Sequence, residues 1–508
     1  MVSPQASGSS SRSLYLSFAT GSGLFSIALI AQRLGGIILL PIMTRFLTPA
    51  DYGVLDLLEQ VGVVLATLLG ANLAWALGYF YFQDESTEVR RRVVGTLILG
   101  SAMLGVAACL ICLPFSSLVS RLVFGSGIAS EYLLLTFAGF VPGFPMEALF
   151  SWLRTTNKLG VYVFGCLFRV GVTIIGTVVL VAGFRLRVWG VLSTSVAAIA
   201  LTAVCLTAYC VRLVRPVFDL RMFGRMARFA APIGIGNLAV FVLNVGDRFI
   251  LPHYRPLSDL GIYVLAYKLG SMIVFVYSPF WYYWGTNVFQ IMKRQDSDSV
   301  FARLFTYVLL LLSFCAVGLV TGARPVLTIL VAPAFRGAVA IVPIIVAAYY
   351  FRAIGDFLRC LFLAAGRPAY DAVCNWAGAG ICLAGYLIMI PKYGIWGAAI
   401  ATAAAFLFVC VVSMAWVYRL RPYRVEKGRL AKIAAATVAG VIPYALLSPQ
   451  WLPGQIALAA LSMAVFPTIL WLLRFPTDGE TEILRTAGRL LAGGRFKAVL
   501  ALAKRGGE

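Results

Sequence analysis

The sequence predicts an all-α membrane protein with about fourteen transmembrane helices. Of its 508 residues, 61% are hydrophobic and only 12% are charged, whereas soluble domains contain about 25% charged residues. The apolar residues also gather in repeated stretches of about 20 residues, the length that a helix needs to cross a hydrocarbon core of about 30 Å. The alternating pattern that a membrane β-barrel needs is absent from the sequence.

Fourteen apolar segments are expected to cross the membrane. They cover residues 23–45, 54–80, 93–116, 131–153, 161–183, 189–211, 229–251, 261–285, 301–323, 338–358, 370–390, 395–418, 431–448 and 453–473. The last two are short and contain Pro443 and Pro467.

The basic residues between these segments predict the orientation. The net charge is +22, with 42 Lys and Arg against 20 Asp and Glu. One set of connections and both termini hold 29 of the basic residues, the other connections hold 8, and five lie within spans. Cytoplasmic segments carry the excess of Lys and Arg, so both termini are expected in the cytoplasm. The positive charge is explained by the membrane, and we expect no nucleic-acid partner.

An internal repeat organises the chain. Three anchors recur at offsets of 207 to 209 residues: Asp51-Tyr52-Gly53 with Asp259-Leu260-Gly261, Asn157-Lys158 with Gly366-Arg367, and Trp189-Gly190 with Trp396-Gly397. The offset spans six helices, so the halves have the same topology, as in transporters whose substrate site lies between two parallel repeats.

The repeat predicts the domain boundaries. We expect a disordered cytoplasmic tail at 1–22, six-helix lobes at 23–215 and 216–420, two further helices within 421–474, and a basic cytoplasmic tail at 475–508. That last tail can lie on an anionic membrane surface.

Five basic residues fall inside predicted spans, where each costs about 2.5–3.5 kcal/mol unless it faces a partner or a wet cavity. They are Arg33, Arg169, Arg248, Lys268 and Arg352. Arg352 can pair with Asp356 four residues later, and the neighbours Asp247 and Arg248 are expected to reach the membrane interface from a helix end. A cationic cavity suits an anionic substrate such as a diphosphate, and the candidate substrate-binding residues are Arg33, Lys268, Arg169 and Arg248.

Three acidic residues in the spans are candidates for ion coupling. Asp56 and Glu59 are three apart and share a helix face, and Glu147 lies in another span. They either take up a proton or sodium ion during transport or only neutralise the buried cations. The single histidine argues against a metal site, and no cofactor is expected.

Several segments resemble the bacterial polysaccharide exporters, the Wzx-type oligosaccharide flippases. They are Arg33 with Leu40-Pro41, the run Thr44-Arg45-Phe46-Leu47-Thr48-Pro49-Ala50-Asp51-Tyr52-Gly53, the Gly366-Arg367 loop, and Tyr393-Gly394-Ile395-Trp396-Gly397-Ala398-Ala399. The resemblance covers helices 1 to 12 and extends to the superfamily that holds lipid II flippases and multidrug extruders.

This resemblance implies a flippase that moves an undecaprenyl-diphosphate-linked oligosaccharide from the cytoplasmic to the outer leaflet by alternating access. Such a protein would serve export of O-antigen, exopolysaccharide or capsule in a bacterial inner membrane, beside a polysaccharide polymerase and glycosyltransferases. It implies that Arg33 and Lys268 belong to a cationic cavity. The connection between helices 1 and 2 differs from that of the lipid II branch, which argues against a peptidoglycan precursor.

Two other functions remain open. A multidrug antiporter on the same fold would favour acidic residues in its cavity, against the basic residues found here. A membrane glycosyltransferase or ligase is suggested only by Asp296-Ser297-Asp298, which has the spacing of a metal-binding DxD motif in a short loop. The run Trp281-Tyr282-Tyr283-Trp284 is interpreted as an interfacial aromatic belt, with sugar stacking as the alternative.

Overall fold

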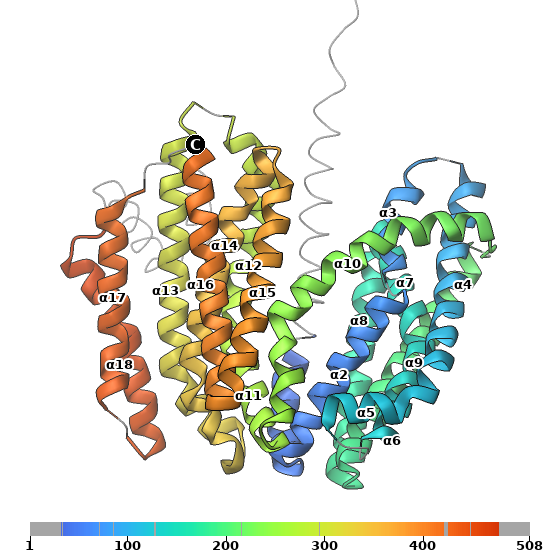
Figure 1. Ribbon diagram of the computed structural model, residues 1–508, viewed down its shortest axis with the longest axis horizontal. Helices are drawn as coiled ribbons and strands as arrows, with labels where there is room; N and C mark the ends of the chain where they lie inside the picture. Colours follow the sequence, from blue (N-terminus) through green and yellow to red (C-terminus); the bar gives the residue numbers. More distant parts are fainter. Residues whose placement is uncertain are drawn as a thin grey trace, which may run out of the picture. The chain divides into compact units, whose positions relative to one another are not determined.

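The computed structural model describes nearly the whole membrane-spanning region, and all its regular elements are helices (Figure 1). The described residues are 32, 34–70, 72–84, 86–125, 129–214, 216–293, 295–420, 425–447 and 449–476. The predicted span 23–45 therefore lies partly outside them, and its second half is described as the helix Leu34–Phe46.

The described chain forms two compact units built from discontinuous segments. Unit 1 contains α2 (Pro49–Leu69), α3 (Leu73–Tyr81), α4 (Thr87–Cys112), α5 (Ser116–Phe124), α6 (Ser130–Ala138), α7 (Phe140–Thr155), α8 (Leu159–Thr177), α9 (Arg187–Val214) and α10 (Leu220–Ile250). Unit 2 contains α12 (Ile273–Ile291), α14 (Val342–Ala364), α17 (Lys427–Leu446) and α18 (Leu452–Leu472). Four helices contribute to both: α11 (Leu257–Gly270), α13 (Ser297–Leu330), α15 (Pro368–Tyr393) and α16 (Ile395–Leu420).

Each predicted span after the first has a helical counterpart. Among the described residues, 11 helices are long and apolar enough to cross a membrane, or up to 13 if each bent pair counts as one span. The protein is thus an all-α multi-pass membrane protein. The lobe boundaries expected at residues 215 and 420 stay predictions.

Three predicted spans are each divided between two α-helices, and one of them, 131–153, divides into α6 and α7 at Gly139. The segment 54–80 divides into α2 and α3, because Gly70 ends α2 in the left-handed region with φ 114°. The segment 261–285 divides into α11 and α12, and no proline marks that break. Helix α5, which follows a 3₁₀ turn at Leu113–Phe115, was not predicted.

The turns that the repeat aligned have the same geometry in both halves. Asn157 and Gly366 each follow a helix in the left-handed region, with φ of 55° and 69°. The next residue forms an equivalent hydrogen bond in both turns. The Lys158 N–H donates to the Leu153 carbonyl at 2.9 Å, and the Arg367 N–H donates to the Phe362 carbonyl at 2.8 Å. This helix-ending motif needs Gly or Asn at the left-handed position.

The core of unit 1 is a cluster of apolar side chains from α3, α4, α7, α8, α9 and α10, which includes Leu77, Leu97, Leu149 and Leu153. Close helix contacts surround it, since a Cβ on Gly105 of α4 would lie 2.5 Å from the Phe140 carbonyl oxygen of α7. Small residues of this kind allow membrane helices to approach closely.

Candidate functional site

A buried ion pair joins α2 to α10 in unit 1. The Arg248 Nη1 donates to both oxygens of the Asp56 carboxylate, at 2.7 and 2.8 Å. The side chains are 7% and 3% exposed, so the pair is shielded from water on all sides. A guanidinium and a carboxylate in such a place stabilise one another, since either one alone would be a buried charge without compensation.

A second carboxylate lies beside this pair. Asp247 is fully buried, accepts a hydrogen bond from the Tyr263 hydroxyl of α11, and accepts another from the Arg248 backbone N–H at 2.9 Å. Two carboxylates and one guanidinium leave the ionised cluster with one excess negative charge. Uptake of a single proton would make the cluster neutral.

Aromatic and hydroxyl groups from three more helices enclose the charges. The ring centroid of Tyr267 on α11 lies 4.9 Å from the Arg248 guanidinium. The hydroxyls of Tyr386 on α15 and Thr402 on α16 lie 2.9 Å apart, and the Tyr386 ring packs against the backbone at Gly246 of α10. We call Asp56, Asp247, Arg248, Tyr263, Tyr267, Tyr386 and Thr402 the charge cluster.

The charge cluster forms a layer near one end of its helices. Asp56 and Tyr263 lie seven and six residues after the first residues of α2 and α11, and Arg248 lies two residues before the end of α10. Tyr386 and Thr402 lie seven residues from the ends of α15 and α16 that meet at residues 393–395. At 1.5 Å per residue, these five residues lie at most about 10 Å inside that end, and Tyr267 lies one turn deeper on α11.

Two glycines allow the backbones of α2 and α11 to meet just outside this layer. A Cβ added to Gly53 would lie 2.5 Å from the Leu257 carbonyl oxygen, and one added to Gly261 would overlap the Pro49 carbonyl oxygen. The start of α2 is further fixed because Thr48 and Asp51 cap it reciprocally and Arg187 of α9 binds Asp51 at 2.6 Å. This end of unit 1 is closed by direct backbone packing.

The predicted site residues differ in how exposed they are and in which helix carries them. Arg33 lies outside the described residues. Lys268 is exposed in the last turn of α11, Arg169 is half-buried on α8, and the predicted coupling residues Glu59 and Glu147 are exposed. Asp56 and Arg248 are described members of the predicted set that the structure brings together, although the sequence placed them in separate roles.

Two sequence-based interpretations are wrong. Asp247 and Arg248 do not reach the interface, because both are buried in the charge cluster. Trp284 does not belong to an interfacial belt, because it is fully buried, stacks on Phe357 at 4.7 Å and donates to that residue's carbonyl at 3.0 Å. Trp281 is 39% exposed.

Sequence reasoning missed Asp247, Tyr263, Tyr386 and Thr402 as members of one site. A signal existed, since a hydroxyl in a membrane span needs a hydrogen-bond partner, and three hydroxyls together with a carboxylate mark a polar layer. The predicted spans indicate that these residues lie at a common depth, but they do not indicate which side of each helix the residues occupy.

A second charged cluster lies in unit 2, and here the predicted pair exists. The Arg352 Nε lies 3.7 Å from the Asp356 carboxylate, which also binds Arg359 and accepts a hydrogen bond from Tyr277 at 2.6 Å. Arg359 lies 3.2 Å from Asp371. Two basic and two acidic residues balance in this cluster, which suits a structural role.

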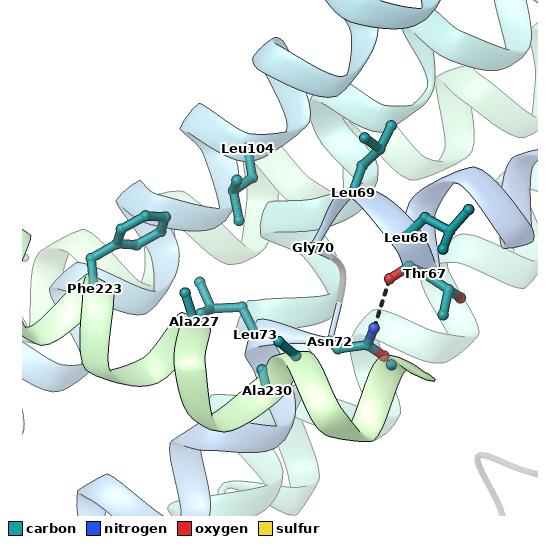
Figure 2. Close-up of a pocket in the computed structure, with 12 residues that line it drawn as sticks. Thr67, Leu68, Leu69, Gly70, Asn72, Leu73, Leu104, Phe223, Ala227 and Ala230 are labelled. Carbon is teal, nitrogen blue, oxygen red and sulfur yellow. Dashed lines mark hydrogen bonds between the residues drawn. The ribbon is translucent and has the colours of Figure 1, made fainter. Parts of the chain in front are cut away.

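An apolar cavity of about 360 Å³ opens at the break between α2 and α3 (Figure 2). It is lined mainly by aliphatic and aromatic side chains such as Leu104 and Phe223. Asn72 points toward α2 and donates to the Thr67 carbonyl at 2.8 Å. None of the predicted cationic or acidic site residues that the structure describes lines this cavity.

Groups of three or more His, Cys, Asp or Glu side chains that could hold a metal ion do not occur within the described ranges. The Asp296-Ser297-Asp298 motif therefore gains no further ligand there.

Comparison with known protein families identifies the family to which this chain belongs. A family described as polysaccharide biosynthesis protein matches residues 18–283, more than half of the chain. The chain belongs to this polysaccharide biosynthesis protein family. The resemblance noted in the sequence is thereby confirmed. No curated protein sequence gives a significant match.

Solved structures show which fold this family member has. The lipid II flippase MurJ in an inward closed conformation matches with a TM-score of 0.71 at 15% identity, over 88% of this chain and 98% of that one. An inward-facing multidrug resistance MATE transporter of the MOP superfamily matches with a TM-score of 0.61 at 13% identity, over 79% and 98%. A MOP-superfamily transporter from Pyrococcus furiosus matches with 0.52 at 15% identity, over 80% and 95%. The fold of the family member is therefore that of the MOP superfamily.

Proposed function

We propose that the protein is a flippase that carries an undecaprenyl-diphosphate-linked oligosaccharide from the cytoplasmic to the outer leaflet by alternating access. The observation that carries this proposal is the family match combined with a fold that covers 98% of a lipid II flippase. The family name supports a polysaccharide precursor as cargo, and the flippase fold supports a lipid-linked one.

The proposal places the protein in a bacterial inner membrane with both termini in the cytoplasm. The termini and the connections on the same side of the membrane carry 29 of the 42 basic residues. The charge cluster and the Gly53–Gly261 contact then lie at the extracytoplasmic end of unit 1. Export of O-antigen, exopolysaccharide or capsule would follow, with the polymerase and glycosyltransferases of the same pathway as partners.

Arg33, Lys268 and Arg169 are proposed to bind the diphosphate through charge-assisted hydrogen bonds. Arg248 is removed from this set, because Asp56 neutralises it and both are buried. Lys268 is exposed and can reach a bound anion.

The charge cluster is proposed to couple transport to a proton gradient. Asp56 is held by Arg248, so Asp247 is the carboxylate to which a proton can add without breaking the ion pair. Protonation would cancel the excess charge and reverse the direction of the Tyr263 hydrogen bond, since a protonated carboxyl can donate. Separation of α2 from α11 at the extracytoplasmic end would complete the outward opening. A sodium-coupled cycle is the alternative.

The test uses purified protein in vesicles that contain a fluorescent undecaprenyl-diphosphate oligosaccharide. An impermeant quencher measures how much fluorophore moves between the leaflets. We expect movement with the native protein and its loss in Arg33→Ala and Lys268→Ala, whereas Arg121→Ala on the exposed face of α5 retains it.

Absence of movement under both proton and sodium gradients, with folded protein present, would refute the proposed cargo. Uptake of a cationic dye by the same vesicles would then favour the multidrug antiporter.

A further inference from the structure

A basic cavity lies in unit 1 at the opposite end from the charge cluster. Its volume is about 400 Å³, and it is formed by the end of α3, the start of α4 and the ends of α7 and α9. Tyr81, Arg90, Arg91 and Trp152 supply its polar and aromatic wall. None of these four helices contributes to the charge cluster, and the chain crosses unit 1 through α2 and α3 (Figure 1).

Arg90 in this cavity is oriented by groups that leave its charge intact. The Arg90 Nε donates to the Asp84 carbonyl at 3.1 Å, and its guanidinium lies 5.1 Å from the Tyr81 ring centroid. A carbonyl and an aromatic ring hold a guanidinium in place without neutralising it. The nearby Glu88 carboxylate is bound to Arg92 at 3.2 Å, and no described acidic residue lines the cavity.

Further positive potential comes from the surroundings. The Lys158 ammonium lies 4.8 Å from the ring centroid of Trp152, which forms part of the cavity wall. Thr87, the first residue of α4, also lines the cavity, and Ser86 does not cap that helix with its side chain. The first N–H groups of α4 add a partial positive charge to that of the arginines. The cavity thus favours a compact anion.

Apolar surface borders the cavity. Leu213 of α9 lines it and is 54% exposed, and Phe82, next to Tyr81, is 65% exposed. In a membrane protein, such exposed apolar side chains beside basic residues meet acyl chains below the level of the head groups. An anion with an attached hydrocarbon chain therefore matches the cavity better than a free anion does.

The second half of the sequence offers an internal comparison. The start of α13 and the ends of α14 and α16 form a cavity of about 390 Å³, lined by Phe301, Phe305, Leu358, Val411, Met414, Ala415, Val417, Tyr418 and Val425. Among the described residues, those that line it are all uncharged. The repeat offset aligns Arg90-Arg91 with residues near Ser297-Asp298. Within the described residues, basic side chains therefore line the cavity of unit 1 and not its counterpart.

We propose that the basic cavity of unit 1 binds the phosphate head group of an anionic phospholipid of the surrounding membrane. Arg90 and Arg91 hold the phosphate oxygens, Trp152 and Tyr81 pack against the glycerol region, and one acyl chain lies along Leu213. This site is separate from the proposed path of the oligosaccharide and goes beyond the proposed function.

The test measures lipid binding to the full chain by native mass spectrometry with dioctanoyl phosphatidylglycerol as the probe. The double variant Arg90→Ala and Arg91→Ala is compared with Arg221→Ala and Arg228→Ala, which removes two exposed arginines from α10. We expect the first variant to bind the probe roughly 10- to 30-fold more weakly, as two basic residues near an anionic lipid predict. The α10 variant and the zwitterionic lipid phosphatidylcholine define the background.

A second pair, Arg90→Lys and Arg91→Lys, separates charge from folding. Because it keeps both charges, we expect it to retain most of the binding, with an unchanged melting temperature in phosphatidylcholine. Equal weakening in the α10 variant would overturn the proposal by showing a general charge effect. Competition by inorganic phosphate as strong as by the lipid, or displacement by the undecaprenyl-diphosphate oligosaccharide, would also overturn it, since the site would then hold free phosphate or the cargo.

Discussion

Gly53 and Gly261 occupy equivalent positions in the two halves of the sequence, and each packs against the first residue of the helix that carries the other. Gly53 of α2 lies over the Leu257 carbonyl of α11, and Gly261 of α11 lies over the Pro49 carbonyl of α2. The reciprocal contact is what a two-fold relation between the halves would produce.

This contact predicts that a methyl group at either glycine will force α2 and α11 apart. We expect Gly261→Ala and Gly53→Ala to destabilise the protein by about 1–3 kcal/mol, the usual cost of overpacking. The loss is measured as a fall in melting temperature in detergent. Gly78→Ala on α3 is the control, because a Cβ there meets no atom within 4 Å. Equal effects at Gly78 and Gly261 would contradict the close packing.

The buried ion pair predicts strong coupling between its two members. Asp56→Asn or Arg248→Gln should each cost about 3–5 kcal/mol, because each removes one partner of a buried, hydrogen-bonded ion pair. The double variant should lose less than the sum of the two single losses, since it removes both charges. A double-mutant cycle of unfolding free energies checks this, and additive losses would mean that the pair does not interact.

Asp247 is predicted to carry the coupling proton. Asp247→Asn imitates the neutral carboxyl, so the variant should fold and still equilibrate the lipid-linked oligosaccharide between leaflets, while a pH gradient no longer accelerates movement. Glu131→Gln, on the exposed face of α6, should respond to the gradient like the native protein. A normal gradient response in Asp247→Asn would exclude this residue as the coupling site.

The paired turns at Asn157 and Gly366 predict a graded response to substitution. Gly366→Ala should cost about 1–2 kcal/mol, because a Cβ is strained at positive φ. Gly366→Asn should cost less, because asparagine already occupies the matching turn in the first half. Gly380→Ala on α15 lies in open space and serves as the control in the same melting experiment. A tolerated Gly366→Ala would show that the turn can relax.

The sequence predicted the membrane class and the position of nearly every described helix, because crossing a hydrocarbon layer needs a long apolar run and that run is visible locally. The breaks at Gly70 and before α12 were missed, because the apolar character continues across them. The pairing of Arg352 with Asp356 could be predicted, since both lie on one helix four residues apart.

The charge cluster lay beyond such local reasoning. Asp56 and Arg248 are 192 residues apart, and a membrane span does not reveal which side faces a neighbouring helix.

The sequence by itself therefore determined the class of protein, the spans and the repeat, because these depend on composition and on order along the chain. Only the tertiary structure decided which buried charges meet. It showed that Arg248, which the sequence assigned to the cargo site, forms an ion pair with Asp56. It also showed that Asp247 accepts a hydrogen bond from Tyr263 and that Gly53 packs against α11. The physical reason is that a buried charge must find its partner wherever the packing of helices brings one, independent of distance in sequence.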